Sequence, residues 1–181
     1  MARERSFRRS WPFSILLFFL SGVSPAFAFD PYLAPRLAVS LATLQTTLEK
    51  VGGPVTFAPR PGSQQGTQEA RLPGNAGIVQ AGGGAENLAA VVLWLPVDEK
   101  GKLVGAKARL YLDAFVRLFL ADSEEITRWV EHALARAATE SGKEPHLESR
   151  LLDKHQFKLT YVPTLSPPMC SLTVTAASDA R

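Results

Sequence analysis

The sequence predicts an α+β fold, in which an antiparallel sheet built from hairpins carries two amphipathic helices packed on one face. Two stretches have apolar residues at helical spacing, and the stretches between and after them contain strand-like runs. A helix with one apolar face must be covered, and an antiparallel sheet can cover it while its other face meets water or a partner. The 181 residues suit a single domain, since domains contain roughly 100 to 200 residues.

The first predicted helix is marked by leucines that fall on one helical face. They are Leu37, Leu41, Leu44 and Leu48. The Gly-Gly-Pro sequence at 52–54 ends this helix, because Gly and Pro interrupt helical backbone. Residues 54–58 then fit a short strand.

A Gly/Pro-rich loop is predicted at about residues 59–87. This stretch contains seven Gly and three Pro and few large apolar residues. Its last Gly, Gly84, is followed by Ala-Glu-Asn rather than by Lys and Ser or Thr, so the stretch does not match a phosphate-binding loop. We therefore expect a connecting loop without a nucleotide site.

A hairpin is predicted from residues 88–97 and 103–112, joined by the polar turn 98–101. The first run is continuously apolar, the second alternates, and Gly lies late in the turn, as it does in many antiparallel connections. Residues 113–120 fit a helix face and a strand equally well.

The hairpin register predicts a candidate binding patch on the face away from the core. Its members are Trp94, Lys107, Arg109 and Tyr111. Trp94 would lie opposite Gly105 and could simply shield exposed backbone. Alternatively, aromatic residues beside Arg and Lys form a recognition surface, since this mixture is favoured where proteins bind partners.

The second predicted helix covers residues 122–139. Asp122, with Glu125 three residues later, resembles a capping box. Six apolar residues then share one face for three turns: Ile126, Trp129, Val130, Ala133, Leu134 and Ala137. Alternation at 157–161 and 172–174 predicts two further strands that pair with each other.

Residues 1–28 have the order of a secretory signal peptide. Four Arg precede a short apolar run, and small residues at Ala26 and Ala28 fit a cleavage site after Ala28. The run is shorter than the roughly 20 residues of a membrane-spanning helix. We expect a mature domain of residues 29–181 outside the cytoplasm, in the periplasm or secreted, and a membrane association only if the segment stays uncleaved.

Charge and cysteine content narrow the class of partner. Without residues 1–28, which hold four Arg and one Glu, the chain keeps 16 basic and 16 acidic residues. A nucleic-acid-binding protein usually shows a clustered excess of Lys and Arg, so we do not expect a nucleic acid partner. Cys170 is the only cysteine and cannot form an intramolecular disulfide; it is either a buried structural thiol or a reactive one.

Motifs that carry chemistry are not found. The chain has no Gly-x-Ser-x-Gly elbow, no Ser-x-x-Lys and no His-Glu-x-x-His. Glu144, His146 and Glu148 alternate as metal ligands could, but Pro145 favours a loop there. We expect neither a metal nor another cofactor.

These observations favour an exported, non-enzymatic module that binds a protein or a cell-envelope component through the outer face of its sheet. The alternative is an extracytoplasmic hydrolase whose catalytic residues are dispersed in the sequence. That alternative requires His146, His155 and Cys170 to converge in the fold. The oligomeric state is left open by the sequence.

Overall fold

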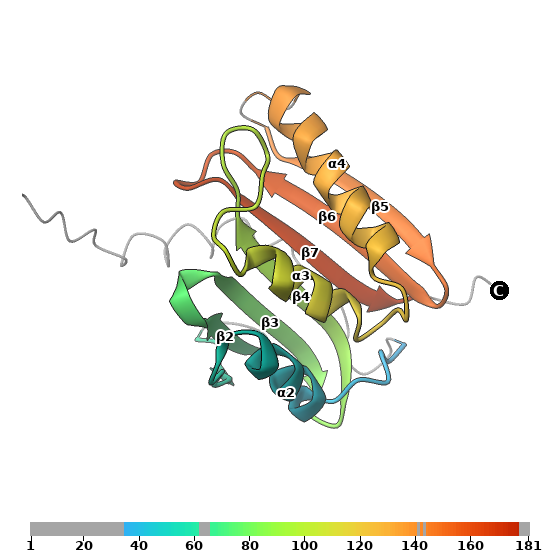
Figure 1. The fold of residues 1–181 in the computed structure, drawn as a ribbon. Helices are drawn as coiled ribbons and strands as arrows, with labels where there is room; N and C mark the ends of the chain where they lie inside the picture. Colours follow the sequence, from blue (N-terminus) through green and yellow to red (C-terminus); the bar gives the residue numbers. More distant parts are fainter. Residues whose placement is uncertain (1–34, 62–65, 141, 143, 178–181) are drawn as a thin grey trace, which may run out of the picture. The chain divides into compact units, whose positions relative to one another are not determined.

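The computed structural model describes residues 35–61, 66–140, 142 and 144–177 (Figure 1), and these fall in one compact unit. Its helices are α2 (Leu41–Gly52), the short 3-10 helix η1 (Pro73–Asn75), α3 (Ala108–Val116) and α4 (Glu124–Glu140). Its strands are β1 (Ala58–Pro59), β2 (Gln68–Leu72), β3 (Gly77–Gly84), β4 (Asn87–Pro96), β5 (His146–Leu152), β6 (His155–Val162) and β7 (Met169–Ala176).

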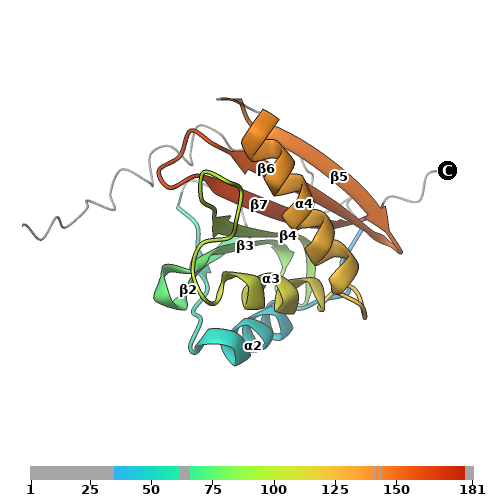
Figure 2. The ribbon, with the colours of Figure 1, turned by 45° about the horizontal axis from the view of Figure 1, so that its top comes forward.

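The seven strands form one antiparallel sheet in the order β1-β2-β3-β4-β7-β6-β5. Helices α2, α3 and α4 lie on the same face of this sheet, as the two views in Figures 1 and 2 show. The predicted α+β class with helices on one face is therefore confirmed, with three α-helices in the described part of the chain instead of two.

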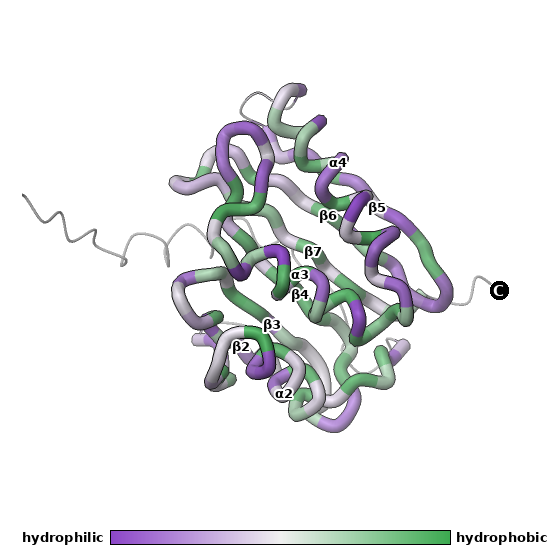
Figure 3. Tube along the Cα trace, viewed as in Figure 1, coloured by the Kyte–Doolittle hydropathy of each residue, from purple (hydrophilic) through white to green (hydrophobic). Residues whose placement is uncertain are grey.

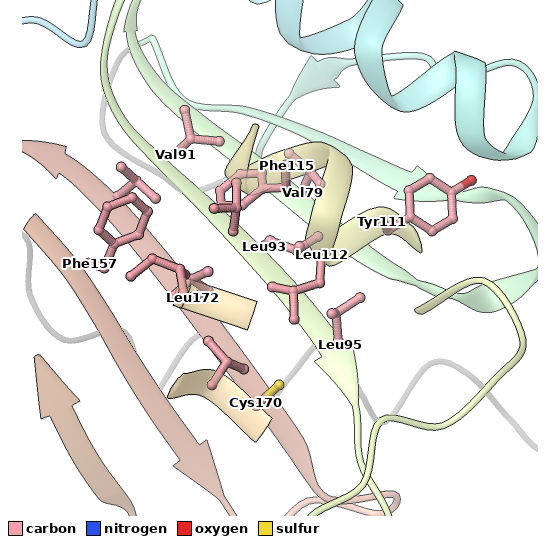
Figure 4. Close-up of a cluster of buried hydrophobic side chains, with 14 of the residues drawn as sticks. Val79, Val91, Leu93, Leu95, Tyr111, Leu112, Phe115, Phe157, Cys170 and Leu172 are labelled. Atoms are coloured by element: carbon pink, nitrogen blue, oxygen red, sulfur yellow. The ribbon is translucent and has the colours of Figure 1, made fainter. Parts of the chain in front are cut away.

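The core lies between the sheet and the helices. Alternate residues of a strand point to opposite faces, and Val91, Leu93 and Leu95 of β4 all point to the helix side, where they are buried (Figure 4). Helix α3 lies over them and buries Leu112 and Phe115 completely or nearly so. In Figure 3 most of β4 is hydrophobic, whereas α4 carries hydrophilic residues along much of its length.

Two predicted helices are confirmed, but α2 begins at Leu41, so Leu37 precedes the helix that it was predicted to join. Ser40 caps α2, because its hydroxyl accepts a hydrogen bond from the Thr43 N–H at 3.1 Å. The Asp122 carboxylate accepts a hydrogen bond from the Glu124 N–H at 2.9 Å, at the start of α4. Trp129 of α4 is only partly buried, at the margin of the core.

The predicted hairpin of residues 88–97 and 103–112 is wrong. The turn forms, and Asp98 accepts hydrogen bonds from the Lys100 and Lys102 N–H groups, but only Val97 and Leu103 pair across it. Both edges of β4 are already occupied, by β3 and by β7, so the chain after the turn has no edge to join. It forms α3 instead, which also answers the open question at 113–120 in favour of a helix as far as Val116.

The predicted loop at 59–87 is also wrong, since β2, η1 and β3 occupy most of the part that is described. The Gly residues do not prevent pairing, because ladder hydrogen bonds join backbone atoms. A register shift between Gly82 and Gly83 accommodates them. Gly83 has a φ of +109° and a Cβ there would come within 2.7 Å of the Ala89 nitrogen, so this position needs glycine.

The Tyr111 hydroxyl gives a test of the packing between α3 and α2. It is buried against Gly52 and has no hydrogen-bond partner among the described residues, and burial raises the pKa of Tyr111. Since an unsatisfied buried polar group costs about 1 to 3 kcal/mol, Tyr111→Phe should leave the free energy of unfolding unchanged or raise it by about 1 kcal/mol. Urea melts measure this change.

Tyr111→Ala is the matched comparison, because it removes the ring as well as the hydroxyl. It should lower the free energy of unfolding by about 3 to 5 kcal/mol. A loss above about 1 kcal/mol for Tyr111→Phe would mean that the hydroxyl does have a partner.

Candidate binding face of the sheet

The structure separates the four residues of the predicted patch. Trp94 lies on β4 and is half-buried, whereas Tyr111 belongs to α3 and lies in the core with 0% exposure. Lys107 immediately precedes α3, and the exposed Arg109 pairs with Glu131 of α4 at 3.5 Å. The prediction that these four residues share one face was wrong, because it relied on the hairpin. Whether the individual residues bind a partner stays untested.

Trp94 instead belongs to the outer face, the side of the sheet opposite the three helices. The strand register gives two rows of neighbouring side chains across this face. One row contains Arg71, Ile78, Trp94, Ser171, Thr160 and Leu147; the other contains Glu69, Gln80, Val92, Thr173, Lys158 and Ser149. None of the helices that the structure describes covers these rows (Figures 1 and 2).

A chain of polar contacts fixes the Trp94 indole on the outer face. Its Nε1 donates to the Gln80 side-chain oxygen at 3.4 Å, and the Gln80 amide donates to Glu69 at 2.9 Å. Glu69 also pairs with Arg60 at 3.6 Å. These contacts link β4, β3 and β2 and continue to the residue after β1, so Trp94 is held in a defined orientation.

The side chains around Trp94 are short and mostly uncharged. Ser171, Thr173 and Val92 have only 4%, 8% and 8% exposure, so the side chains beside Trp94 are themselves largely shielded from solvent. Their packing leaves the Trp94 ring as the largest side chain of the two rows. Sequence reasoning placed Trp94 on the correct face but could not identify Gln80 or Ser171 as its neighbours, because both come from strands that it did not pair with β4.

The residues required by the hydrolase alternative do not converge. Cys170 pairs with Tyr161 at one end of β7, whereas His155 pairs with Ala176 at the other end. Cys170 is buried, and this burial raises the pKa of its thiol to about 12, so the thiolate needed for nucleophilic attack is disfavoured.

His146 and Glu148 lie on β5, in a strand and not in the predicted loop. The His146 ring nitrogen is 2.9 Å from Glu148, and Arg136 of α4 donates to both carboxylate oxygens of Glu148 at 2.8 Å. Partial burial raises the pKa of Glu148, but the hydrogen bonds from His146 and Arg136 outweigh it and leave the pKa below its ordinary value. Glu148 is thus already neutralised by Arg136, and no group of potential metal ligands occurs among the described residues.

A polar pocket of about 310 Å³ lies between α3 and the beginning of α4. Its polar groups bond to one another: Thr127 donates to Asp113 at 2.7 Å, and Arg117 donates to Ser123 at 3.2 Å. Neither His nor Cys lines it. The polar groups of this pocket therefore hold α3 and α4 together, and none of these contacts indicates a catalytic role.

Comparisons with protein-family models, with curated proteins and with solved structures found no match. Across the residues that the structure describes, none of the helices combines the length and apolar character needed to cross a bilayer.

The environment of His155 indicates how the free energy of unfolding should depend on pH. Its ring contacts Phe119 and Phe157, with centroids 5.5 and 6.4 Å apart, and its buried Nδ1 has no partner among the described residues. Burial lowers the pKa of His155 below 6.5, although Asp153 acts in the opposite direction. The unfolded chain therefore binds the proton more readily, so the free energy of unfolding should fall as the pH falls below about 6.5.

Urea melts of the wild type and His155→Phe at about pH 7.5 and pH 5.5 measure this effect, because Phe cannot take up the proton. The wild type should lose more stability than the variant between these two values. The carboxyl groups whose pKa is lowered, such as Glu148, act at lower pH and remain in both proteins. Equal losses would show that His155 is not protonated differently in the folded and unfolded chains.

Proposed function

We propose that this protein is an exported, non-enzymatic module that binds a protein or a component of the cell envelope through the outer face of its sheet. The observation that carries the proposal is Trp94, whose indole is fixed by Gln80 on a face that none of the described helices covers. An oriented, partly exposed aromatic ring gives a partner a rigid contact area.

The second argument is preorganisation. Binding normally costs free energy because contact side chains lose rotamer freedom. Gln80 is held by Glu69, and Glu69 by Arg60, so the ring beside them is oriented before a partner arrives. The free-energy cost of ordering this face on binding is therefore smaller.

The third argument concerns which partner fits. The rows around Trp94 carry hydroxyls and amides, with Lys158 as the one charged side chain on their central strands β4, β6 and β7. Such a face favours hydrogen bonding and stacking over attraction between charges. It suits a polar, weakly charged surface, such as part of a protein or an envelope polymer, better than a phosphate backbone.

Export is supported by the sequence alone, because residues 1–28 lie outside the described residues. The order of basic, apolar and small residues supports a signal peptide, and the charge balance of residues 29–181 supports a partner other than nucleic acid.

Binding is tested by a pull-down from envelope extract with immobilised protein. Trp94→Ala should reduce recovery of the captured component by at least about tenfold, as truncation of a central aromatic contact does. Leu110→Ala is the matched control: Leu110 is 54% exposed, but it lies on α3, on the other side of the sheet. Urea melts must show that both variants are folded.

Equal recovery by folded Trp94→Ala and by the wild type would contradict the proposed face. Loss of recovery by Leu110→Ala alone would move the binding surface to the helix side.

Export is tested by mass spectrometry of the protein that accumulates outside the cytoplasm. The N-terminal residue should be Phe29, since Ala26 and Ala28 satisfy the small-residue rule for cleavage. An intact Met1 in a membrane fraction would show that residues 1–28 act as an anchor.

A further inference from the structure

The two edges of the sheet are built differently. Edge strand β1 has two residues, one of which is Pro59, and such short, Pro-containing edges resist pairing with other chains. Edge strand β5 has seven residues without Gly or Pro, and its register with β6 is unbroken. One edge of β5 bonds to β6, and at its other edge the strand order of the described residues ends, so none of them pairs with the backbone groups there.

The outward side chains of β5 are apolar. Leu147 and Leu151 are 55% and 63% exposed, on either side of the exposed Ser149. They belong to the outer face, because their partners on β6 are Thr160 and Gln156. An exposed, regular strand edge flanked by large apolar side chains is the kind of surface to which another strand adds.

Two of the helix-side residues of β5, Glu148 and Arg150, are charged, and they lie between His146 and Leu152 on that side. Glu148 is bonded to Arg136, and Arg150 donates to Glu125 at 2.6 Å, so both side chains point toward α4. Charges at an edge usually prevent pairing, because an incoming strand would have to bury them beside its own side chains. A strand with the opposite charge at each position lowers this cost.

A second copy of β5 is such a strand. The sequence Leu147-Glu148-Ser149-Arg150-Leu151 has a two-fold pattern about Ser149. Antiparallel pairing of two copies centred on Ser149 places Leu147 opposite Leu151 of the other copy, and Glu148 opposite Arg150 of the other copy. All four flanking pairs are therefore complementary, two by apolar contact and two by charge.

We propose that the protein forms a two-fold symmetric dimer by antiparallel pairing of β5 with β5 of a second copy, centred on Ser149. The two sheets become one continuous sheet of fourteen strands, twice the seven of one chain, with all helices on one side. The two outer faces then lie side by side. This dimer goes beyond the proposed binding function and does not depend on it.

Other registers of the same pairing are unfavourable. The smallest shifts that keep the helices of both copies on one side move the two-fold axis to Glu148 or to Arg150. They place like charges directly opposite each other, Glu148 against Glu148 or Arg150 against Arg150, and such pairs are destabilising. Larger shifts, to Leu147 or Leu151, leave only three residues of β5 paired with the other copy. The charges that repel other strands thus also select the register centred on Ser149.

Sedimentation equilibrium of the protein, in the form that accumulates in the cell, tests the dimer. The wild type should have twice the mass of one chain, and Ser149→Glu should weaken association by at least about tenfold, because it places two carboxylates together at the axis. Ser149 is exposed, so the variant leaves the core unchanged. Gln156→Glu is the matched control, with the same charge on the exposed outer face of β6, and it should remain dimeric.

Disulfide formation tests the register. In Ser149→Cys the two new thiols meet at the axis, within the Cα separation of about 4.4 to 6.8 Å that a disulfide needs. In Leu147→Cys the two thiols lie about 13 Å apart along the strands, four residues at roughly 3.3 Å each. Oxidation should therefore link Ser149→Cys into dimers and leave Leu147→Cys unlinked.

A monomeric wild type, or a Ser149→Glu variant that associates like the wild type, would overturn the proposal. Efficient linkage of Leu147→Cys in place of Ser149→Cys would overturn it as well. None of these outcomes depends on the partner of the outer face, so they leave the binding proposal to its own test.

Discussion

The rest of the structure depends on the environment of β4, which is bonded along both edges and contributes one face to the core. Its edges are taken by β3 and β7, and Val91, Leu93 and Leu95 occupy the core. A strand with both edges occupied cannot accept the segment that follows it. That segment therefore becomes α3, and it covers the apolar face of β4 with Leu112 and Phe115, which are almost fully buried.

The same constraint determines where a partner can bind. All three α-helices pack on the core side, so the polar rows of the other side are left without a helix among the described residues. Trp94 is the large side chain on that side, and its contact with Gln80 fixes it there. Strand β5 extends the argument to the sheet edge, where the contacts of Glu148 and Arg150 with α4 restrict the strands that can be added.

Local patterns were sufficient for the elements that depend on local packing. Leucine spacing predicted α2, and apolar spacing with the Asp122 cap predicted α4. Local patterns failed where pairing between distant segments determines whether a segment forms a strand or a helix. Leu110 and Leu112 looked like alternate strand residues, but in α3 Leu112 is buried and Leu110 is exposed, because β7 occupies the edge that the second strand would have used. The Gly-rich stretch of β3 was missed because its pairing relies on backbone groups.

The central claim is that the described helices all pack on one face of the sheet, and that Trp94 on the other face is partly exposed to solvent. Hydroxyl-radical footprinting of the free protein, read residue by residue by mass spectrometry, measures this directly, because oxidation follows side-chain exposure. The account predicts that Trp94 is oxidised several-fold faster than Tyr111 and Phe115, after correction for intrinsic reactivity, since these two have 0% exposure. Protection of Trp94 equal to that of Phe115 would contradict the account.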